Sequence, residues 1–94
     1  MLAIGICTIE LHIPESGSLK AKRQVLKSLK DRLRQEFNVS VAELEEHDLW
    51  QKSVLGIACV GNEKRHVNQV LDSAVNLVER NPRVRVLDYQ IGFV

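Results

Sequence analysis

The apolar residues of this chain predict an α+β fold with the element order β-α-β-β-α-β. Two segments carry apolar residues at three- and four-residue spacings, as amphipathic helices do, and four shorter segments are apolar or alternate. Helices of about 17 residues with short connections complete the pattern. The chain has 94 residues, which suits one domain. We therefore expect residues 1–94 to form a single domain, and the order of its elements predicts a ferredoxin-like fold.

The first half of the chain predicts one β-α-β unit. Residues 2–13 are rich in Ile and Leu and form the first expected strand, which ends at a proline. Ser18 can cap the helix that follows over 19–36, because its hydroxyl can accept an early amide hydrogen bond. The alternating segment 38–45 predicts a second strand, and the polar residues 46–50 predict a hairpin connection.

The second half repeats the same plan. Residues 51–60 predict the third strand, and Asn62 is expected to cap a second helix over 63–79. Pro82 stops that helix because proline cannot continue it. Residues 83–94 predict the last strand.

This order is that of the ferredoxin-like sandwich, in which two right-handed crossovers place both helices on one face of a four-stranded antiparallel sheet. The other face of the sheet is then uncovered. We expect Ile9, Leu11 and Ile13 to face the helices, whereas Ile4 and Ile6 face outward.

The uncovered face predicts a contact with another protein or with a second copy. Ile4 and Ile6 are expected to lie beside Val39 and Val41 in one apolar patch, and such patches often mark interfaces. We therefore expect a homo-oligomer, with these residues at the oligomer interface. The alternative is that loops or the chain end cover this face.

The first helix carries the clearest chemical feature of the chain, a set of basic side chains. At 100° per residue, most of them fall inside an arc of about 80° at the border of the leucine face. Such a stripe is typical of proteins that bind the phosphate backbone of nucleic acid. The alternative is a solvated helix face, and the acidic residues between 43 and 48 can also pair with the helix. The candidate nucleic-acid-binding residues are Lys20, Lys22, Arg23, Lys27, Lys30 and Arg34.

The sequence holds no recognisable catalytic constellation. It lacks a P-loop, a GxGxxG motif and a GxSxG motif. The three histidines, His12, His47 and His66, fall on different elements, so we expect no metal site. We likewise expect no cofactor and no small-molecule ligand. A base-stacking sheet is disfavoured because the first and third strands contain no aromatic residue.

The two cysteines indicate a reducing compartment. Cys7 and Cys59 each lie in an apolar run, where a thiol usually packs as a small hydrophobe. The first apolar stretch is too short for a signal sequence or a membrane span. We expect a cytoplasmic protein with no membrane association. The single tryptophan, Trp50, lies at the expected hairpin, where it can either anchor a partner or close the core.

Several short strings in this chain occur together in one known family. They are SLKAKR at 18–23, FNVSVAE at 37–43, DLWQ at 48–51 and LGIA at 55–58. Their combination resembles the YlxP-like family of small bacterial proteins, catalogued as domain of unknown function 503. The resemblance runs from the first strand to the last and implies a ferredoxin-like fold.

The resemblance also implies a setting for the protein, although it implies no catalytic residues. Family members are often encoded beside translation and ribosome-maturation genes, which suggests a ribosome- or RNA-associated accessory protein. We therefore expect ribosomal RNA or a ribosome-associated protein as the partner. One departure lies at the chain end, where QIGFV is more apolar than the charged ending typical of the family.

Overall fold

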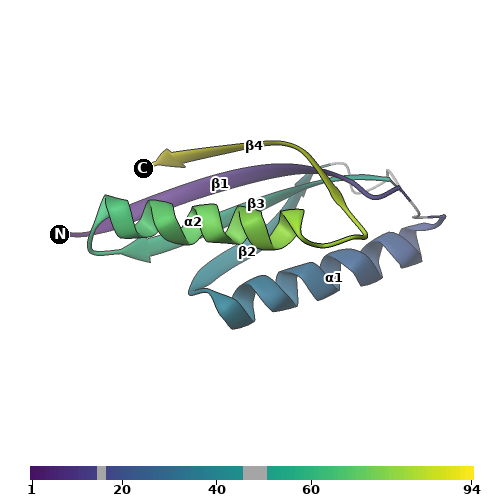
Figure 1. Cartoon of the computed structure of the whole chain (residues 1–94), viewed down its shortest axis with the longest axis horizontal. Helices are drawn as coiled ribbons and strands as arrows, with labels where there is room; N and C mark the ends of the chain where they lie inside the picture. The colour runs from purple at the N-terminus through teal and green to yellow at the C-terminus, as the bar shows by residue number, and fades with distance from the viewer. Residues whose placement is uncertain (15–16, 46–50) are drawn as a thin grey trace.

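The computed structural model describes residues 1–14, 17–45 and 51–94. The elements follow the predicted order, and their bounds lie within one or two residues of the prediction (Figure 1). The expected hairpin at 46–50, with Trp50, lies outside the described residues. The elements are β1 (Ala3–His12), α1 (Leu19–Glu36), β2 (Val39–Glu45), β3 (Lys52–Gly61), α2 (Lys64–Glu79) and β4 (Arg85–Phe93).

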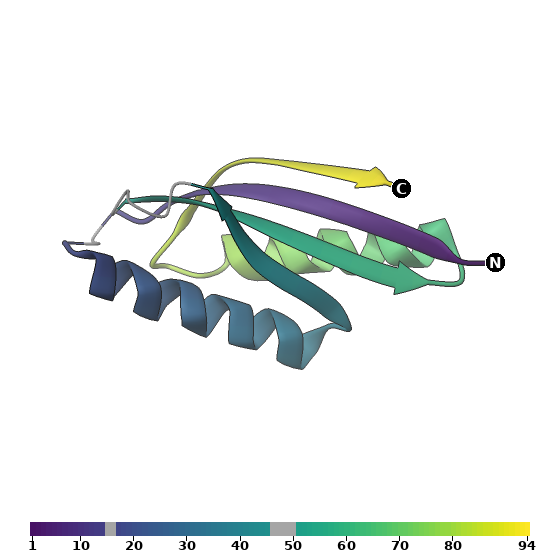
Figure 2. The same ribbon diagram turned by 180° about the vertical axis from the view of Figure 1, so that it is seen from behind.

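The four strands form one antiparallel sheet in the order β2-β3-β1-β4. The strands that flank each helix in the sequence are therefore separated in the sheet by a third strand, as the split β-α-β plan requires. Figures 1 and 2 show both helices on one side of the sheet, with α1 beside β2 and α2 beneath the central strands. The predicted ferredoxin-like fold is confirmed.

The central strand β1 divides the molecule into a core side and an open side. Its side chains alternate between buried and exposed along almost the whole strand, because successive residues of a strand point to opposite faces. Ile9 and Leu11 are fully buried against the helices, as predicted. Ile4 and Ile6 point away from the helices and remain exposed, which also matches the prediction.

The two helices begin in different ways. Ser18 caps α1 as predicted, since its hydroxyl accepts a hydrogen bond of 3.1 Å from the amide of Ala21. The prediction that Asn62 caps α2 is wrong. The capping position belongs to Glu63, and its side chain makes no cap hydrogen bond. Burial of the apolar face, which includes Val67 and Leu71, holds this helix in place.

Helix α2 packs closely against β1 at Gly5. A Cβ atom added at this position would lie 2.5 Å from Cγ1 of Val67 and 2.8 Å from Cδ1 of Leu71. The glycine therefore sets how closely the helix packs on the sheet. Gly92 differs from Gly5, because an added Cβ atom there would meet nothing within 4 Å.

We predict that Gly5→Ala lowers the free energy of unfolding by about 1–3 kcal/mol, since the new methyl group forces the helix or its side chains to move. Gly92→Ala is the matched control and should change stability by less than about 0.5 kcal/mol. Urea unfolding followed by circular dichroism measures both values. Equal losses in the two variants would contradict the close packing at Gly5.

Candidate functional site

The basic residues of α1 do not form one uniform surface. Lys22 is only 2% exposed, so the prediction that it contacts nucleic acid is wrong. The physical reason is its position, because Lys22 precedes Leu26 and Leu29 by four and seven residues and so lies on the leucine face. Its burial places it in the core side of the helix rather than on the outer stripe.

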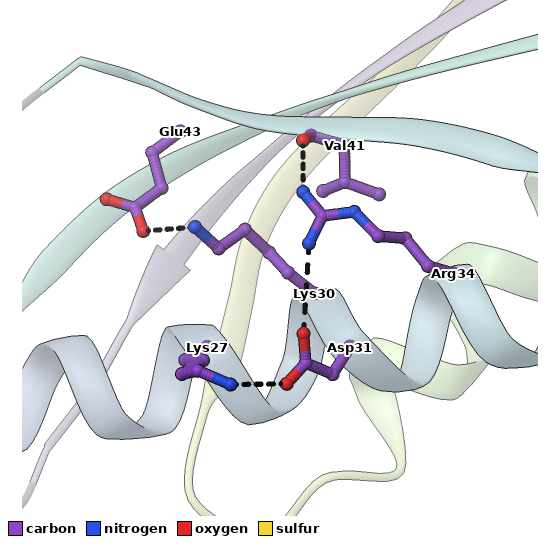
Figure 3. Close-up of polar contacts among 6 residues, drawn as sticks. All are labelled: Lys27, Lys30, Asp31, Arg34, Val41 and Glu43. Carbon is purple, nitrogen blue, oxygen red and sulfur yellow. Dashed lines mark hydrogen bonds and ion pairs between the residues drawn. The ribbon is translucent and has the colours of Figure 1, made fainter.

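Two of the predicted contact residues, Lys30 and Arg34, reach toward β2 (Figure 3). Nζ of Lys30 lies 2.9 Å from Oε1 of Glu43, and both side chains are largely buried, with 23% and 21% of their surface exposed. Nη2 of Arg34 donates a hydrogen bond of 2.9 Å to the backbone carbonyl of Val41. β2 is an edge strand of the sheet. Arg34 therefore occupies a backbone carbonyl on this edge, and Lys30 pairs with a carboxylate beside it. The acidic residue Glu43 thus pairs with the basic helix, one of the alternatives that the sequence left open.

Asp31 neutralises part of the remaining charge on α1. Its carboxylate lies 2.8 Å from Nζ of Lys27 and 3.8 Å from Nη1 of Arg34. The hydrogen bond from Lys27, together with the charges of Lys27, Arg34 and Lys30, lowers the pKa of Asp31. Lys27 itself remains 77% exposed, so its ammonium group is accessible to a ligand.

Lys20 and Arg23 remain as exposed cations near the start of α1. Among the described residues, neither forms an ion pair with an acidic group. The first turn of α1 also contains no acidic residue. The stripe therefore divides into an accessible part (Lys20, Arg23 and Lys27) and an edge-covering part (Lys30 and Arg34).

The open face of the sheet is apolar, but its composition differs from the prediction. Ile4 and Ile6 lie on it, whereas Val39 and Val41 do not. Val41 is only 8% exposed and belongs to the core, and Val39 packs against the core. Their registered partners on β3 are the buried Cys59 and Ile57, which places both valines on the helix side. The prediction that these valines lie at an oligomer interface is wrong. Alternate residues of β2 point to opposite faces of the sheet, and the set that contains the two valines is the more apolar one and faces the helices.

Residues that the sequence analysis missed complete the open face. Val60 is 50% exposed and lies beside Ile4. Leu44 is also exposed and lies at a β-bulge. The residues on either side of it, Glu43 and Glu45, pair with two consecutive residues of β3, Leu55 and Val54. The extra residue aims the Leu44 side chain across the sheet. A Cβ atom added at Gly56 would lie 2.9 Å from Cδ1 of Leu44, so the leucine covers the glycine. A glycine inside an apolar strand often marks a place where another group lies close to the backbone, so Gly56 is the sequence feature that could have indicated the contact with Leu44.

Two shallow hollows flank Leu44 on this face. One has a volume of about 370 Å³ and is bordered almost wholly by apolar atoms, including side chains of Ile6, Ala42 and Ala58. The other has a volume of about 310 Å³ and brings Glu10 and Asp88 beside Tyr89. The open face is therefore apolar toward one end and acidic toward the other.

The two thiols are buried in the core and free. Burial raises the pKa of Cys7 from 9.0 to about 11, and the nearby charge of Asp72 adds to this shift. Burial also raises the pKa of Cys59. Both groups are therefore protonated near neutral pH, which makes them poor nucleophiles and poor metal ligands.

The described residues bring together no group of three or more His, Cys, Asp or Glu side chains that could hold a metal ion. His12 lies on β1 and His66 on α2. His47 and Asp48 lie outside the described residues. No helix in the described part of the chain is long and apolar enough to cross a membrane.

Comparisons with known proteins match most of the chain. The model of a family described as "Protein of unknown function (DUF503)" matches residues 4–91. The chain is also 35% identical over 81 residues to "Uncharacterized protein YlxP" of Bacillus subtilis (strain 168), which covers 86% of this chain and 88% of that protein.

Solved structures show the same fold at low sequence identity. The designed protein Foldit4 matches with a TM-score of 0.57 and 9% identity, covering 100% of this chain and 97% of the design. A C-terminal segment of the alpha subunit of aIF2 from Pyrococcus abyssi matches with a TM-score of 0.54 and 14% identity. That match covers 99% of this chain and 49% of the archaeal one. These likenesses support the fold alone.

We predict that the Lys30–Glu43 pair stabilises the fold more than the Lys27–Asp31 pair does. A double-mutant cycle with Lys30→Met and Glu43→Gln should give a coupling energy of about 1 kcal/mol, because this pair is shielded from solvent. The control cycle, Lys27→Met with Asp31→Asn, should give a smaller coupling that salt screens further. Urea unfolding at two salt concentrations measures both, and a larger coupling in the control cycle would contradict this assignment.

Proposed function

The chain belongs to the DUF503 family of proteins of unknown function, and we propose that it acts by binding rather than by catalysis. In this proposal it is a ribosome- or RNA-associated accessory protein. The accessible cations of α1 (Lys20, Arg23 and Lys27) contact the phosphate backbone. They position the protein on structured RNA and confer little sequence specificity.

The observation that carries the proposal is the placement of positive charge near the start of α1. The helix dipole disfavours cations at this end, and the first turn has no acidic residue to offset them. Lys20 and Arg23 are exposed and form no ion pair with a described acidic residue. Because helix stability does not account for these charges, a negatively charged ligand is the better explanation.

Lys30 and Arg34 have a different role in this proposal. Their contacts with Glu43 and with the carbonyl of Val41 attach α1 to the edge strand β2. The attachment fixes the orientation of the helix, so that its outer cations face one direction. Such a small set of contacts predicts modest affinity with a clear salt dependence.

Ribosomal RNA is the target that we propose, because members of the family that this chain resembles are often encoded beside translation and ribosome-maturation genes. The fold's usual base-stacking mode is not required, since β1 and β3 offer no aromatic side chain within the described residues. Contacts through phosphates suit folded RNA, whose bases are largely paired.

We predict that Lys20→Glu with Arg23→Glu weakens co-sedimentation with ribosomal subunits. The slope of log binding constant against log salt should fall by roughly 1.4–1.8 if both contacts are lost. Lys64→Glu with Arg65→Glu is the control, because both residues are exposed at the start of α2 and give the same change in net charge. Equal binding by both variants would mean that the cations of α1 are only solvated.

The open sheet face supports a second candidate function, which is self-association as a protein-interaction domain. Ile6 and Leu44 are exposed and border an apolar hollow of about 370 Å³, and the paired residues Ile4 and Val60 are exposed farther along the same face. A second copy offers the same apolar surface, so two open faces can cover each other. This contact leaves α1 free, so it is compatible with RNA binding.

We predict that Ile6→Lys removes any association step that uses the open face, because it places a charge in the centre of the apolar surface. Ser73→Lys, on the exposed side of α2, adds the same charge and should leave association unchanged. Sedimentation velocity over a range of concentrations measures the mass. Identical behaviour of the parent and both variants would exclude a contact through this face.

A further inference from the structure

The two edges of the sheet differ in how side chains cover their backbone groups. On the β2 edge, Arg34 donates to the carbonyl of Val41, and the Lys30–Glu43 pair lies beside it. The opposite edge is β4, and Figures 1 and 2 show that no helix or strand of the described residues lies on its outer side. An uncovered edge strand presents main-chain donors and acceptors that can pair with another strand.

The pairing of β4 with β1 determines which amides and carbonyls of β4 point away from the sheet. The amide of Val94 donates a hydrogen bond of 3.0 Å to the carbonyl of Ile4. In an antiparallel pair, residues that exchange hydrogen bonds alternate with residues that do not. Gly92 and Gln90 therefore turn their backbone groups toward β1, whereas Phe93 and Ile91 turn theirs away from it.

The end of β4 near the C-terminus lacks the features that usually protect an edge. Residues 89–94, YQIGFV, contain no charged residue and no proline. The protective features of β4 lie near its other end, which begins with the exposed Arg85. Leu87 is the extra residue of a β-bulge, and Oδ1 of Asp88 accepts a hydrogen bond of 2.8 Å from the amide of Tyr89.

We propose that this edge binds a second copy of the chain, with the two β4 strands antiparallel about a two-fold axis at Ile91. Ile91 then faces Ile91 of the second copy, and the two residues exchange main-chain hydrogen bonds. Tyr89 faces Phe93 of the second copy, and Gln90 faces Gly92. Each of these facing pairs is uncharged, and the outward amides of Ile91 and Phe93 gain acceptors.

A second copy fits this edge because the edge is complementary to itself. The two-fold register brings an aromatic pair together twice, and aromatic cross-strand pairs stabilise sheets. Tyr89 is exposed and can move to meet Phe93, which is half-buried with Nζ of Lys64 located 5.6 Å from its ring centre. The closed symmetry also covers the edge completely, so no further strand can add there.

The pairing would produce one continuous eight-stranded sheet. Because the axis is perpendicular to the sheet, the helices of both copies lie on the same side and the two open faces adjoin on the other. The β2 strands and their α1 helices become the outer ends, with the β2 strands about 34 Å apart at the usual strand spacing. This proposal does not depend on what α1 or the open face binds.

A charge-swap experiment at Gln90 and Gly92 tests both the contact and its register. Both positions accept longer side chains in the single copy, since Gln90 is exposed and an added Cβ atom at Gly92 meets nothing within 4 Å. Gln90→Lys with Gly92→Lys places like charges opposite each other across the axis. Gln90→Lys with Gly92→Glu places opposite charges there instead.

Sedimentation equilibrium of the full chain should show a concentration-dependent dimer. The dilysine variant should dimerise roughly tenfold more weakly than the lysine–glutamate variant. Ile6→Lys, on the open face, should leave this dimerisation step unchanged. A parent chain that is monomeric at all concentrations would overturn the proposal. Equal dimerisation by both charge variants would also overturn it.

Hydrogen exchange of single amides provides a direct second measurement. The Ile91 and Phe93 amides should exchange more slowly as the protein concentration rises, because pairing gives them acceptors. The Gly92 amide, which faces β1, should show no such dependence. Fast exchange of Ile91 and Phe93 in a sample shown to be dimeric would overturn the β4 contact and indicate association through another surface.

Discussion

The placement of both helices on one side of a four-stranded sheet is the constraint on which the rest of the structure depends. This arrangement buries one face of the central strands β1 and β3 and leaves their other face to solvent. The buried face supplies the core through β1, whose Ile9 and Leu11 are fully covered. The same constraint exposes Ile6 and Val60 on the other side, so the open face is a direct consequence of the way the core is built.

The cations of α1 fall into two groups because they face two directions. Lys30 and Arg34 point toward β2, where they meet Glu43 and a backbone carbonyl. Lys20, Arg23 and Lys27 point toward solvent. The first pair orients the helix, and the second set is available to a ligand. A nearly neutral chain, with a net charge of +1, can thus present a local cationic surface.

Coverage of one sheet edge by α1 also shapes the proposed assembly. Since side chains of α1 occupy the β2 edge, the β4 edge is the one left for strand pairing. A dimer built there places the basic helices at opposite ends of a wide sheet. The open faces then form a single surface on the side away from the helices, so RNA binding and protein contacts need not compete.

The sequence by itself determined the element order, the capping role of Ser18 and the outward direction of Ile4 and Ile6. These features depend on local periodicity and on hydrogen bonds between near neighbours, which a linear pattern records. Only the tertiary structure decided which face of β2 is buried, because Val39 and Val41 follow their registered partners on β3. It also decided the roles of Lys22, Lys30 and Arg34, since the burial or pairing of a cation depends on which distant strand packs beside its helix.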